Sequence, residues 1–187
     1  MADLDVLGIA GSLRRDSLNR ALLRAAQEVA PAGMAIRTWD GLAAIPPYDG
    51  DLEEKGIPAP VAGLQGEIEG AGALLLVTPE YNQSLPGVLK NALDWASRPA
   101  GKSSLRGKVV AITGASPGAL GTARAQMDLR RILTAMGGIV VPSPEVLVSL
   151  APQKQDASGS FTDEATRKYL GKLLAELQRW VARFPAG

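Results

Sequence analysis

The residue types best suited to chemistry gather in a short polar loop near the amino terminus. Residues 11–19 read Gly-Ser-Leu-Arg-Arg-Asp-Ser-Leu-Asn and separate an apolar run from a segment with helical spacing. A phosphate group in this loop would meet free backbone N–H groups at a helix start, two hydroxyls, an amide and a guanidinium. The simpler alternative is that Asp16 or Ser17 only caps the helix while the arginines remain in solvent. The loop predicts either a phosphate site or a plain helix cap.

Two well-known phosphate motifs are excluded for this loop. A nucleotide P-loop would continue with Gly-Lys-Ser or Gly-Lys-Thr, and this sequence does not. A dinucleotide fingerprint would need further glycines after Gly11, and the loop lacks them.

A second polar loop follows the most apolar run of the chain. Residues 78–87 read Thr-Pro-Glu-Tyr-Asn-Gln-Ser-Leu-Pro-Gly. The polar groups lie where a planar heterocycle could take backbone hydrogen bonds along its edge and stack on one face. Ser84 and Pro86 are also typical of a helix start. Capping alone would leave the Glu-Tyr-Asn sequence before them without a role.

A third loop, residues 113–121, is rich in glycine and small residues, in the order Thr-Gly-Ala-Ser-Pro-Gly-Ala-Leu-Gly. It is similar to the start of short-chain dehydrogenases, apart from one extra residue. Its late position in the chain argues against that family. Tyr169 and Lys172 are also three residues apart, whereas the family's catalytic pair is four apart. We therefore interpret the loop as a third wall of a ligand site.

The residue types that the chain lacks narrow the chemistry further. The 187 residues include no histidine and no cysteine. This excludes disulfides, zinc–thiolate sites, histidine-ligated metals and a Ser-His-Asp triad. Lys and Arg number 20 against 19 Asp and Glu, so no field of one sign attracts nucleic acid or anionic membranes. Any difficult chemistry must come from a cofactor or use carboxylates, lysine, tyrosine and hydroxyls.

The amino terminus is acidic and leads directly into a short apolar run, unlike a signal peptide. The most apolar run, residues 71–77, is too short to span a bilayer. We expect a cytoplasmic protein that binds neither membranes nor nucleic acid.

Apolar runs alternate with segments of helical spacing along the whole chain. Strands are expected at residues 6–10, 34–39, 72–78 and 108–113, and at 139–148 as one strand bent near Pro142 and Pro144. Helices are expected at residues 18–29, 61–71, 86–96, 122–136 and 162–184, with the Pro- and Gly-rich residues 45–60 as a loop. This alternation predicts one α/β domain over residues 1–187, with a parallel sheet covered by helices on both faces. Ligands of such sheets bind at the carboxyl ends of the strands, where the three loops lie.

Two of these loops carry a resemblance to a known family. Its motifs are Gly11-Ser12-Leu13-Arg14-x-x-Ser17-x-Asn19 and Pro79-Glu80-Tyr81-Asn82-x-Ser84-x-Pro86-Gly87-x-x-Lys90-Asn91-Ala92-x-Asp94-Trp95. Together they resemble the NADPH-dependent FMN reductase family, which includes bacterial quinone, azo-dye and chromate reductases. The similarity runs through nearly the whole chain. It implies a flavodoxin-like three-layer sandwich with a five-stranded parallel sheet in the order 2-1-3-4-5.

The resemblance also implies a function and a set of site residues. The protein would bind FMN and, with NADPH or NADH as co-substrate, reduce quinones, flavins, azo compounds or metal oxyanions such as chromate. The phosphate of FMN would be held by Ser12, Leu13, Arg14, Ser17, Leu18 and Asn19. The isoalloxazine ring would be lined by Pro79, Glu80, Tyr81 and Asn82, with Ser116 closing its far side. No side chain is expected to be catalytic and no metal is expected, because the chemistry takes place on FMN.

Two other functions fit the same fold. A flavodoxin-type electron carrier is one alternative, but such carriers are usually strongly acidic, and a net charge of +1 argues against it. A flavin-free regulator is the other. For the reductase, Tyr81 and residues 46–48 are expected to form walls of the flavin pocket.

We also expect a homodimer or a homotetramer. The helix after the second loop has more apolar surface than one sheet face requires, contributed by Leu85, Val88, Leu89 and Trp95. The resemblance implies the same, with flavin pockets completed by a neighbouring subunit. We further hypothesise that Arg124 and Glu145 are partners across the subunit contact.

Overall fold

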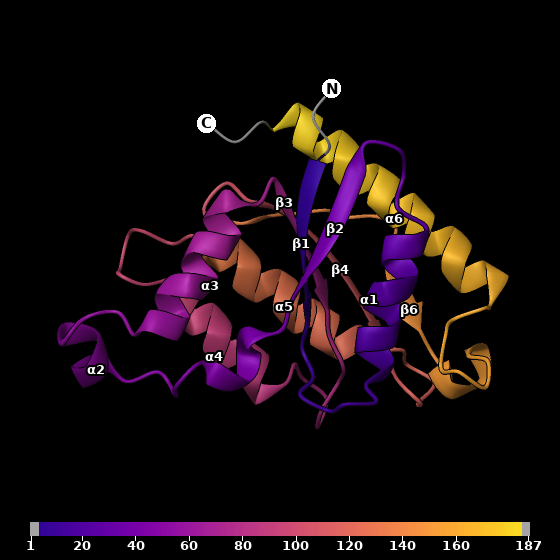
Figure 1. Cartoon of the computed structure of the whole chain (residues 1–187), viewed down its shortest axis with the longest axis horizontal. Coiled ribbons are helices and arrows are strands. Elements are labelled where there is room, and N and C mark those ends of the chain that lie inside the picture. Colours follow the sequence, from indigo (N-terminus) through magenta and orange to yellow (C-terminus); the bar gives the residue numbers. More distant parts are fainter. Residues whose placement is uncertain (1–3, 185–187) are drawn as a thin grey trace.

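The computed structural model describes residues 4–184 and centres on a parallel sheet with the strand order β2-β1-β3-β4-β5 (Figure 1). This is the predicted order. The strands are β1 (Leu4–Ala10), β2 (Met34–Trp39), β3 (Ala73–Val77), β4 (Val109–Ala115), β5 (Ile139–Val140) and β6 (Val146–Val148). Because β1 pairs with both β2 and β3, the direction of winding reverses at β1 and β3. Loops that leave the carboxyl ends of these strands diverge there and leave room for a ligand.

Helices cover both faces of the sheet, which confirms the predicted three layers. They are α1 (Leu18–Glu28), α2 (Gly50–Glu54), α3 (Ala59–Gly70), α4 (Gly87–Ala96), α5 (Ala123–Ala135) and α6 (Glu164–Arg183). Helices α1 and α6 pack on one face, while α3, α4 and α5 pack on the other. Short 3-10 turns are present at Gly41–Ala44 and Ala151–Lys154.

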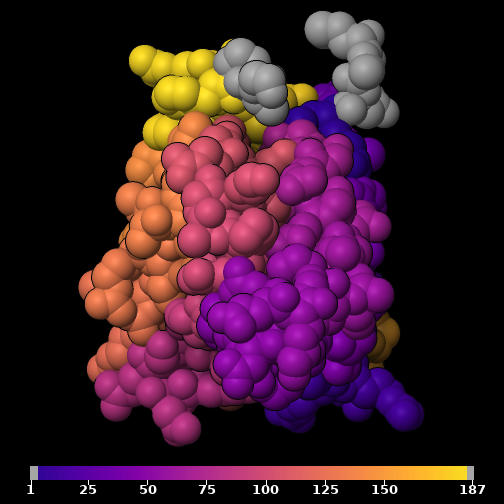
Figure 2. Space-filling model, turned by 90° about the vertical axis from the view of Figure 1, so that its left-hand side faces the viewer, coloured from indigo at the N-terminus to yellow at the C-terminus, as the bar shows by residue number. Residues whose placement is uncertain are grey.

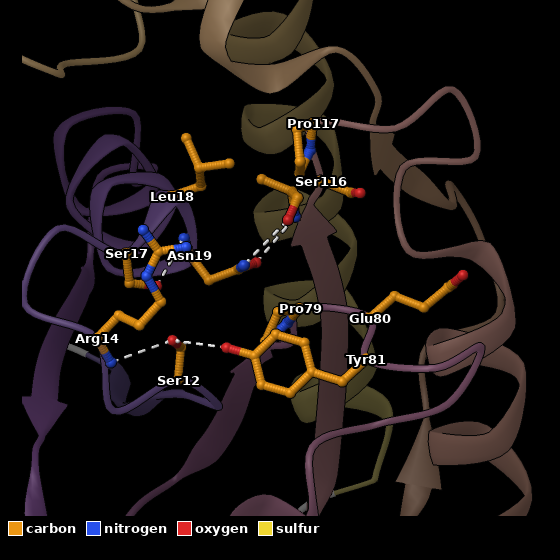
Figure 3. Close-up of a pocket in the computed structure, with 11 residues that line it drawn as sticks. Ser12, Arg14, Ser17, Leu18, Asn19, Pro79, Glu80, Tyr81, Ser116 and Pro117 are labelled. Carbon is orange, nitrogen blue, oxygen red and sulfur yellow. Dashed lines mark hydrogen bonds between the residues drawn. The ribbon is translucent and has the colours of Figure 1, made fainter.

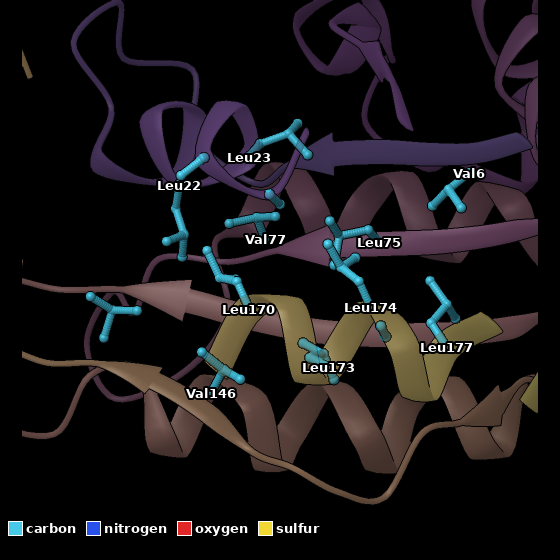
Figure 4. Packing of buried hydrophobic residues seen from close by; sticks show 14 of the residues in the cluster. Val6, Leu22, Leu23, Leu75, Val77, Val146, Leu170, Leu173, Leu174 and Leu177 are labelled. Atoms are coloured by element: carbon cyan, nitrogen blue, oxygen red, sulfur yellow. The ribbon is translucent and has the colours of Figure 1, made fainter. Parts of the chain in front are cut away.

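The two cores explain why the strand register is fixed. Successive side chains of a strand point to opposite faces, so Leu74 and Leu76 of β3 enter one core while Leu75 and Val77 enter the other. The stripe of leucines along α6 packs in the core that contains Leu75 and Val77 (Figure 4). A shift of one residue in the strand pairing would turn each side chain to the opposite face of the sheet. The register is therefore fixed, and it fixes the positions at which the loops leave the strands.

Helix α6 begins at Glu164, two residues after the expected start. Asp163 is its N-cap residue, and its Oδ2 accepts hydrogen bonds from the backbone N–H and the hydroxyl of Thr166, each at 2.7 Å. Among residues 4–184, no helix is both long enough and apolar enough to cross a bilayer.

The segment expected as one bent strand forms two short strands instead. Ile139 and Val140 pair with the start of β4, whereas Val146–Val148 pair with its end. Between them lie Pro142 and Pro144, which have no N–H group to donate to a sheet. The prolines therefore interrupt the strand rather than bend it.

The segment expected as a loop, residues 45–60, contains the short helix α2. Asp49 caps this helix by accepting the N–H of Asp51 at 2.9 Å, and acidic residues occupy its first turn. Both features stabilise a helix start, and the prolines flank the helix without interrupting it. In the space-filling view, the segment around α2 lies over the lower part of the α3–α4 side of the molecule (Figure 2).

Candidate functional site

The three polar loops meet at the carboxyl edge of the sheet and enclose an open cavity of about 210 Å³. It is lined by Ser12, Arg14, Ser17, Leu18, Asn19, Pro79, Glu80, Tyr81, Ala115, Ser116 and Pro117 (Figure 3). Of the predicted site residues, only Leu13 and Asn82 are missing from this lining. Ala115 and Pro117 were not predicted. Their position on either side of Ser116 was the signal that could have found them.

The first loop ends in a capped helix. Ser17 is the N-cap of α1, and its Oγ accepts the backbone N–H groups of Asn19 at 3.2 Å and Arg20 at 3.4 Å. Ser17, not Asp16, therefore provides the cap. A hydroxyl that accepts hydrogen bonds still has its own hydrogen to donate, so the cap and a phosphate ligand are compatible. Arg14 is exposed at the cavity, and Leu13 points its side chain into solvent, 47% exposed.

Asn19 joins the first loop to the third. Its Nδ2 donates to the carbonyl of Ala115 at 3.0 Å, and its Oδ1 accepts the N–H of Ala115 at 2.8 Å. The side chain is buried, and its amide is engaged by the backbone at the end of β4. Asn19 thus lines the cavity mainly as a link between two of its walls.

The second loop contains a tight two-residue turn. Tyr81 and Ser84 exchange backbone hydrogen bonds of 2.9 and 3.1 Å, and between them Asn82 and Gln83 have φ values of 50° and 68°. Two successive positive φ angles define a type I′ turn, where asparagine is favoured. This explains why Asn82 shapes the loop without lining the cavity. The Tyr81 hydroxyl lies 3.2 Å from Ser12 Oγ and so connects the first two loops.

Glu80 connects the second loop to helix α5. Its Oε2 accepts the backbone N–H groups of Arg124 at 3.0 Å and Ala125 at 3.2 Å. The carboxylate is largely buried, with 13% of the side chain exposed, and Arg124 Nη1 lies 4.0 Å from its other oxygen. Glu80 therefore borders the cavity but directs its charge toward α5 (Figure 3).

The third loop lies tightly against the second. A side chain at Gly114 would bring a Cβ within 2.2 Å of the Thr78 carbonyl oxygen, so only glycine fits there. Beyond it, the backbone of Ser116 bonds to Val148 and to Ala151, each at 3.0 Å. These contacts hold Ser116 at the cavity wall, where the sequence places it.

Comparison with known proteins identifies the family. Residues 4–153 match the family described as NADPH-dependent FMN reductase. The chain belongs to this family. It is 45% identical over 181 residues to an NAD(P)H-dependent FMN reductase of Pseudomonas aeruginosa, covering 97% of both chains. It is 38% identical over 182 residues to a quinone reductase of Escherichia coli K12, covering 96% of both.

A solved structure agrees in fold over almost the same length. FerB, a flavoenzyme NAD(P)H:(acceptor) oxidoreductase from Paracoccus denitrificans, superimposes with a TM-score of 0.87 at 37% identity. The match covers 96% of this chain and 98% of that chain. These comparisons confirm the predicted NAD(P)H-dependent oxidoreductase with FMN as its cofactor.

The cavity of this FMN reductase family member suits a phosphate monoester. The hydroxyls of Ser12 and Ser17 and the guanidinium of Arg14 border it at the start of α1. The first turn of α1 contains no acidic residue, so the positive end of the helix is not opposed there. This donor set is chemically suited to the terminal phosphate of FMN.

The remaining family motif, residues 90–95, acts away from the cavity. Asn91 Nδ2 and Trp95 Nε1 both donate to the carbonyl of Pro46, at 2.8 and 2.9 Å, and Asn91 Oδ1 accepts the N–H of Tyr48 at 2.8 Å. Tyr48 packs edge-on against Trp95, with ring centroids 5.0 Å apart. Of the two expected pocket walls, Tyr81 lines the cavity, whereas the Tyr48 segment lies on α4.

Helix α4 does not carry the surplus apolar surface from which we predicted subunit contacts. Leu89 and Trp95 are 1% and 0% exposed, because they fill the core between α4 and the sheet. The side chains of Leu85 and Val88 are partly buried against the same core. The oligomeric state remains a prediction from the resemblance.

The two residues expected at a subunit contact have partners within the chain. Arg124 lies 4.0 Å from Glu80, and Glu145 lies 3.3 Å from Arg130 Nε.

Proposed function

We propose that the protein is an NAD(P)H:quinone oxidoreductase that works through bound FMN. The observation that carries this proposal is one cavity at the carboxyl edge of the sheet that joins a phosphate-suited loop to a second polar loop. Relatives support the acceptor class. They include the E. coli quinone reductase and a 2-hydroxy-1,4-benzoquinone reductase of a Burkholderia species, 41% identical over 178 residues.

Each wall of the cavity has a distinct role in this proposal. Ser12, Ser17 and Arg14 bind the phosphate with the backbone N–H groups of Leu13 and Leu18. Asn19 positions this loop against the third. The backbone of residues 79–82 borders the ring, and Ser116 borders its far side.

FMN, when bound, supplies the two-electron chemistry between a reduced nicotinamide and the acceptor. The chain's own residues orient the two substrates and provide backbone dipoles where negative charge develops. No histidine or cysteine is needed, and the chain has none. Solvent provides the protons that the acceptor takes up.

The test is the cofactor and the acceptor range of the purified protein. We expect mass spectrometry to find FMN, and steady-state NADPH and NADH oxidation to be fastest with benzoquinones. Free FMN, azo dyes, ferric chelates and chromate complete the acceptor panel. The absence of FMN after reconstitution would contradict the proposal. A bound flavin that neither NADH nor NADPH reduces would favour the electron carrier.

We further propose a homodimer or homotetramer in the cytoplasm. Light scattering that reports a monomer at micromolar concentration would contradict the first part. Fractionation of cells would test the second.

A further inference from the structure

The start of helix α5 has an unusual cap. Its N-cap residue, Thr122, has a left-handed backbone with φ of 72°, and its hydroxyl oxygen accepts a hydrogen bond from Gln126 Nε2 at 3.0 Å. The Thr122 side chain is therefore engaged with the interior of the helix. The N–H group of Ala123, the first residue of α5, donates to the carbonyl of Leu120, whereas those of Arg124 and Ala125 donate to Glu80, which lies more than forty residues earlier in the chain.

A second contact fastens the same loop one turn further along α5. Ser84 Oγ donates to Asp128 Oδ2 at 2.6 Å. Glu80 and Ser84 thus attach both ends of the type I′ turn to one helix. The turn between them presents the Tyr81 side chain to the cavity, where its hydroxyl reaches Ser12. The position of the ring-side loop therefore depends on α5.

The charge of Glu80 supports a role away from the ligand. A free carboxylate on the cavity wall would repel a phosphate and any negative charge on the flavin. Here the carboxylate faces the positive end of α5 and lies 4.0 Å from the Arg124 guanidinium. Both interactions hold its charge away from the cavity.

We propose that Glu80 is a positioning residue: its carboxylate caps α5 and thereby holds residues 79–82 in the place that FMN binding requires. This inference rests on the proposed function. The ring-side loop is then fixed before the cofactor arrives, and Glu80 acts through the loop rather than by contact of its carboxylate with the flavin.

Three variants separate positioning from stability and from direct contact. Glu80→Ala removes the carboxylate oxygen that accepts both N–H groups of the cap. Glu80→Gln keeps a carbonyl oxygen that can accept the two N–H groups, without the charge. Asp163→Ala is the matched control, because Asp163 is also a carboxylate that caps a helix, but at α6 and outside the cavity lining.

The readouts are FMN affinity by fluorescence titration of the apoprotein, thermal melting, and amide hydrogen exchange at Arg124 and Ala125. For Glu80→Ala we expect faster exchange at these amides and about tenfold weaker FMN binding, the scale of one helix cap. Glu80→Gln should bind FMN within about threefold of the wild type on the same scale. Asp163→Ala should melt earlier with unchanged FMN affinity. The quinone KM should rise in Glu80→Ala more than kcat falls at saturating FMN.

Two results would overturn the inference while leaving the proposed function intact. One is a Glu80→Ala protein that loses stability like Asp163→Ala but binds FMN as the wild type does. The other is a Glu80→Gln protein as impaired as Glu80→Ala, with an altered flavin absorption spectrum, which would mean direct contact. A wild-type protein that binds no FMN would contradict the proposed function itself.

Discussion

Helix α1 begins at the cavity, whereas α5 begins behind the cavity residue Glu80, and the first turns of the two helices are capped in different ways. The start of α1 is capped by the neutral hydroxyl of Ser17, the residue directly before the helix. The start of α5 is capped by a carboxylate that Glu80 contributes from another loop. Each helix start carries a partial positive charge. Only that of α1 borders the cavity and remains available to an anion, because the start of α5 is already opposed by the Glu80 carboxylate.

The largest effect is expected at the start of α1, where Asn19 bonds to the backbone at the end of β4. Asn19→Ala would leave the buried N–H and C=O of Ala115 without their partner. Each such group costs about 1–3 kcal/mol, so we expect the free energy of unfolding to fall by about 2–6 kcal/mol. Urea denaturation measures this.

Gln27→Ala is the control for that prediction. Gln27 also lies on α1 and donates its amide to a backbone carbonyl, that of Ile36 at 3.0 Å, but in a partly exposed setting. The free energy of unfolding of Gln27→Ala should fall by less than about 1 kcal/mol. Equal losses in the two variants would mean that Asn19 is no special link.

The next effect tests whether α1 is the anion-binding start. Arg14→Ala should weaken FMN binding by about 1.5–3 kcal/mol, the scale of a charge-assisted hydrogen bond. Arg15 is equally cationic and exposed but does not line the cavity. Arg15→Ala should therefore stay within about 0.5 kcal/mol of the wild type. Fluorescence titration at fixed ionic strength compares the FMN affinities of the two variants. Equal losses of affinity would mean that net charge alone causes the effect.

The smallest effect concerns how a carboxylate cap responds to pH. The hydrogen bond from the Thr166 hydroxyl has the largest effect on the pKa of Asp163, followed by the one from the Thr166 backbone N–H. Both lower this pKa below its ordinary value of 3.8. A carboxylate whose pKa is lower in the folded state stabilises the fold above its unfolded pKa, and loses this effect as pH falls through the folded value. The stability difference between wild type and Asp163→Asn should be about 1 kcal/mol near neutral pH and shrink in acid.

Denaturation of both proteins between pH 2 and pH 7 measures that difference. The hydroxyl cap of α1 has no group that titrates in this range. The difference between wild type and Ser17→Ala should therefore stay constant with pH. A pH-independent Asp163 difference would contradict this account.

Much of the fold could be predicted because its signals are local. The apolar run of β3 and the leucine stripe of α6 each follow the period of their element. The helix α2 was missed because its five residues are too few for a periodic signal. The surface of α4 was misjudged for a different reason. Apolar spacing does not tell whether Leu89 and Trp95 face their own sheet or another subunit.

The site was predictable as a place and less so as a set of contacts. The three loops could be placed because the carboxyl ends of parallel strands share one edge. The partners of Glu80, Asn19 and Asn91 lie 44, 96 and 45 residues away in sequence. No local pattern indicates such pairs. Asn19 and Glu80, which the resemblance assigns to the FMN site, therefore also link the loops around the cavity to neighbouring elements.

The amide of Asn19 has one further consequence, for the length of the strands. Thr113 still bonds to the β3 side, through the N–H of Thr78, but Pro79 cannot continue the ladder because it has no N–H. Ser116 bonds to Val148 on the opposite side of β4, so the backbone of Ala115 faces the position where β3 would have continued. The Asn19 side chain supplies the donor and acceptor that a further strand residue would have given. The side chain of one helix residue thus replaces a pair of backbone hydrogen bonds of the sheet. Strand β4 can therefore extend past the end of β3 and bring Ser116 to the cavity.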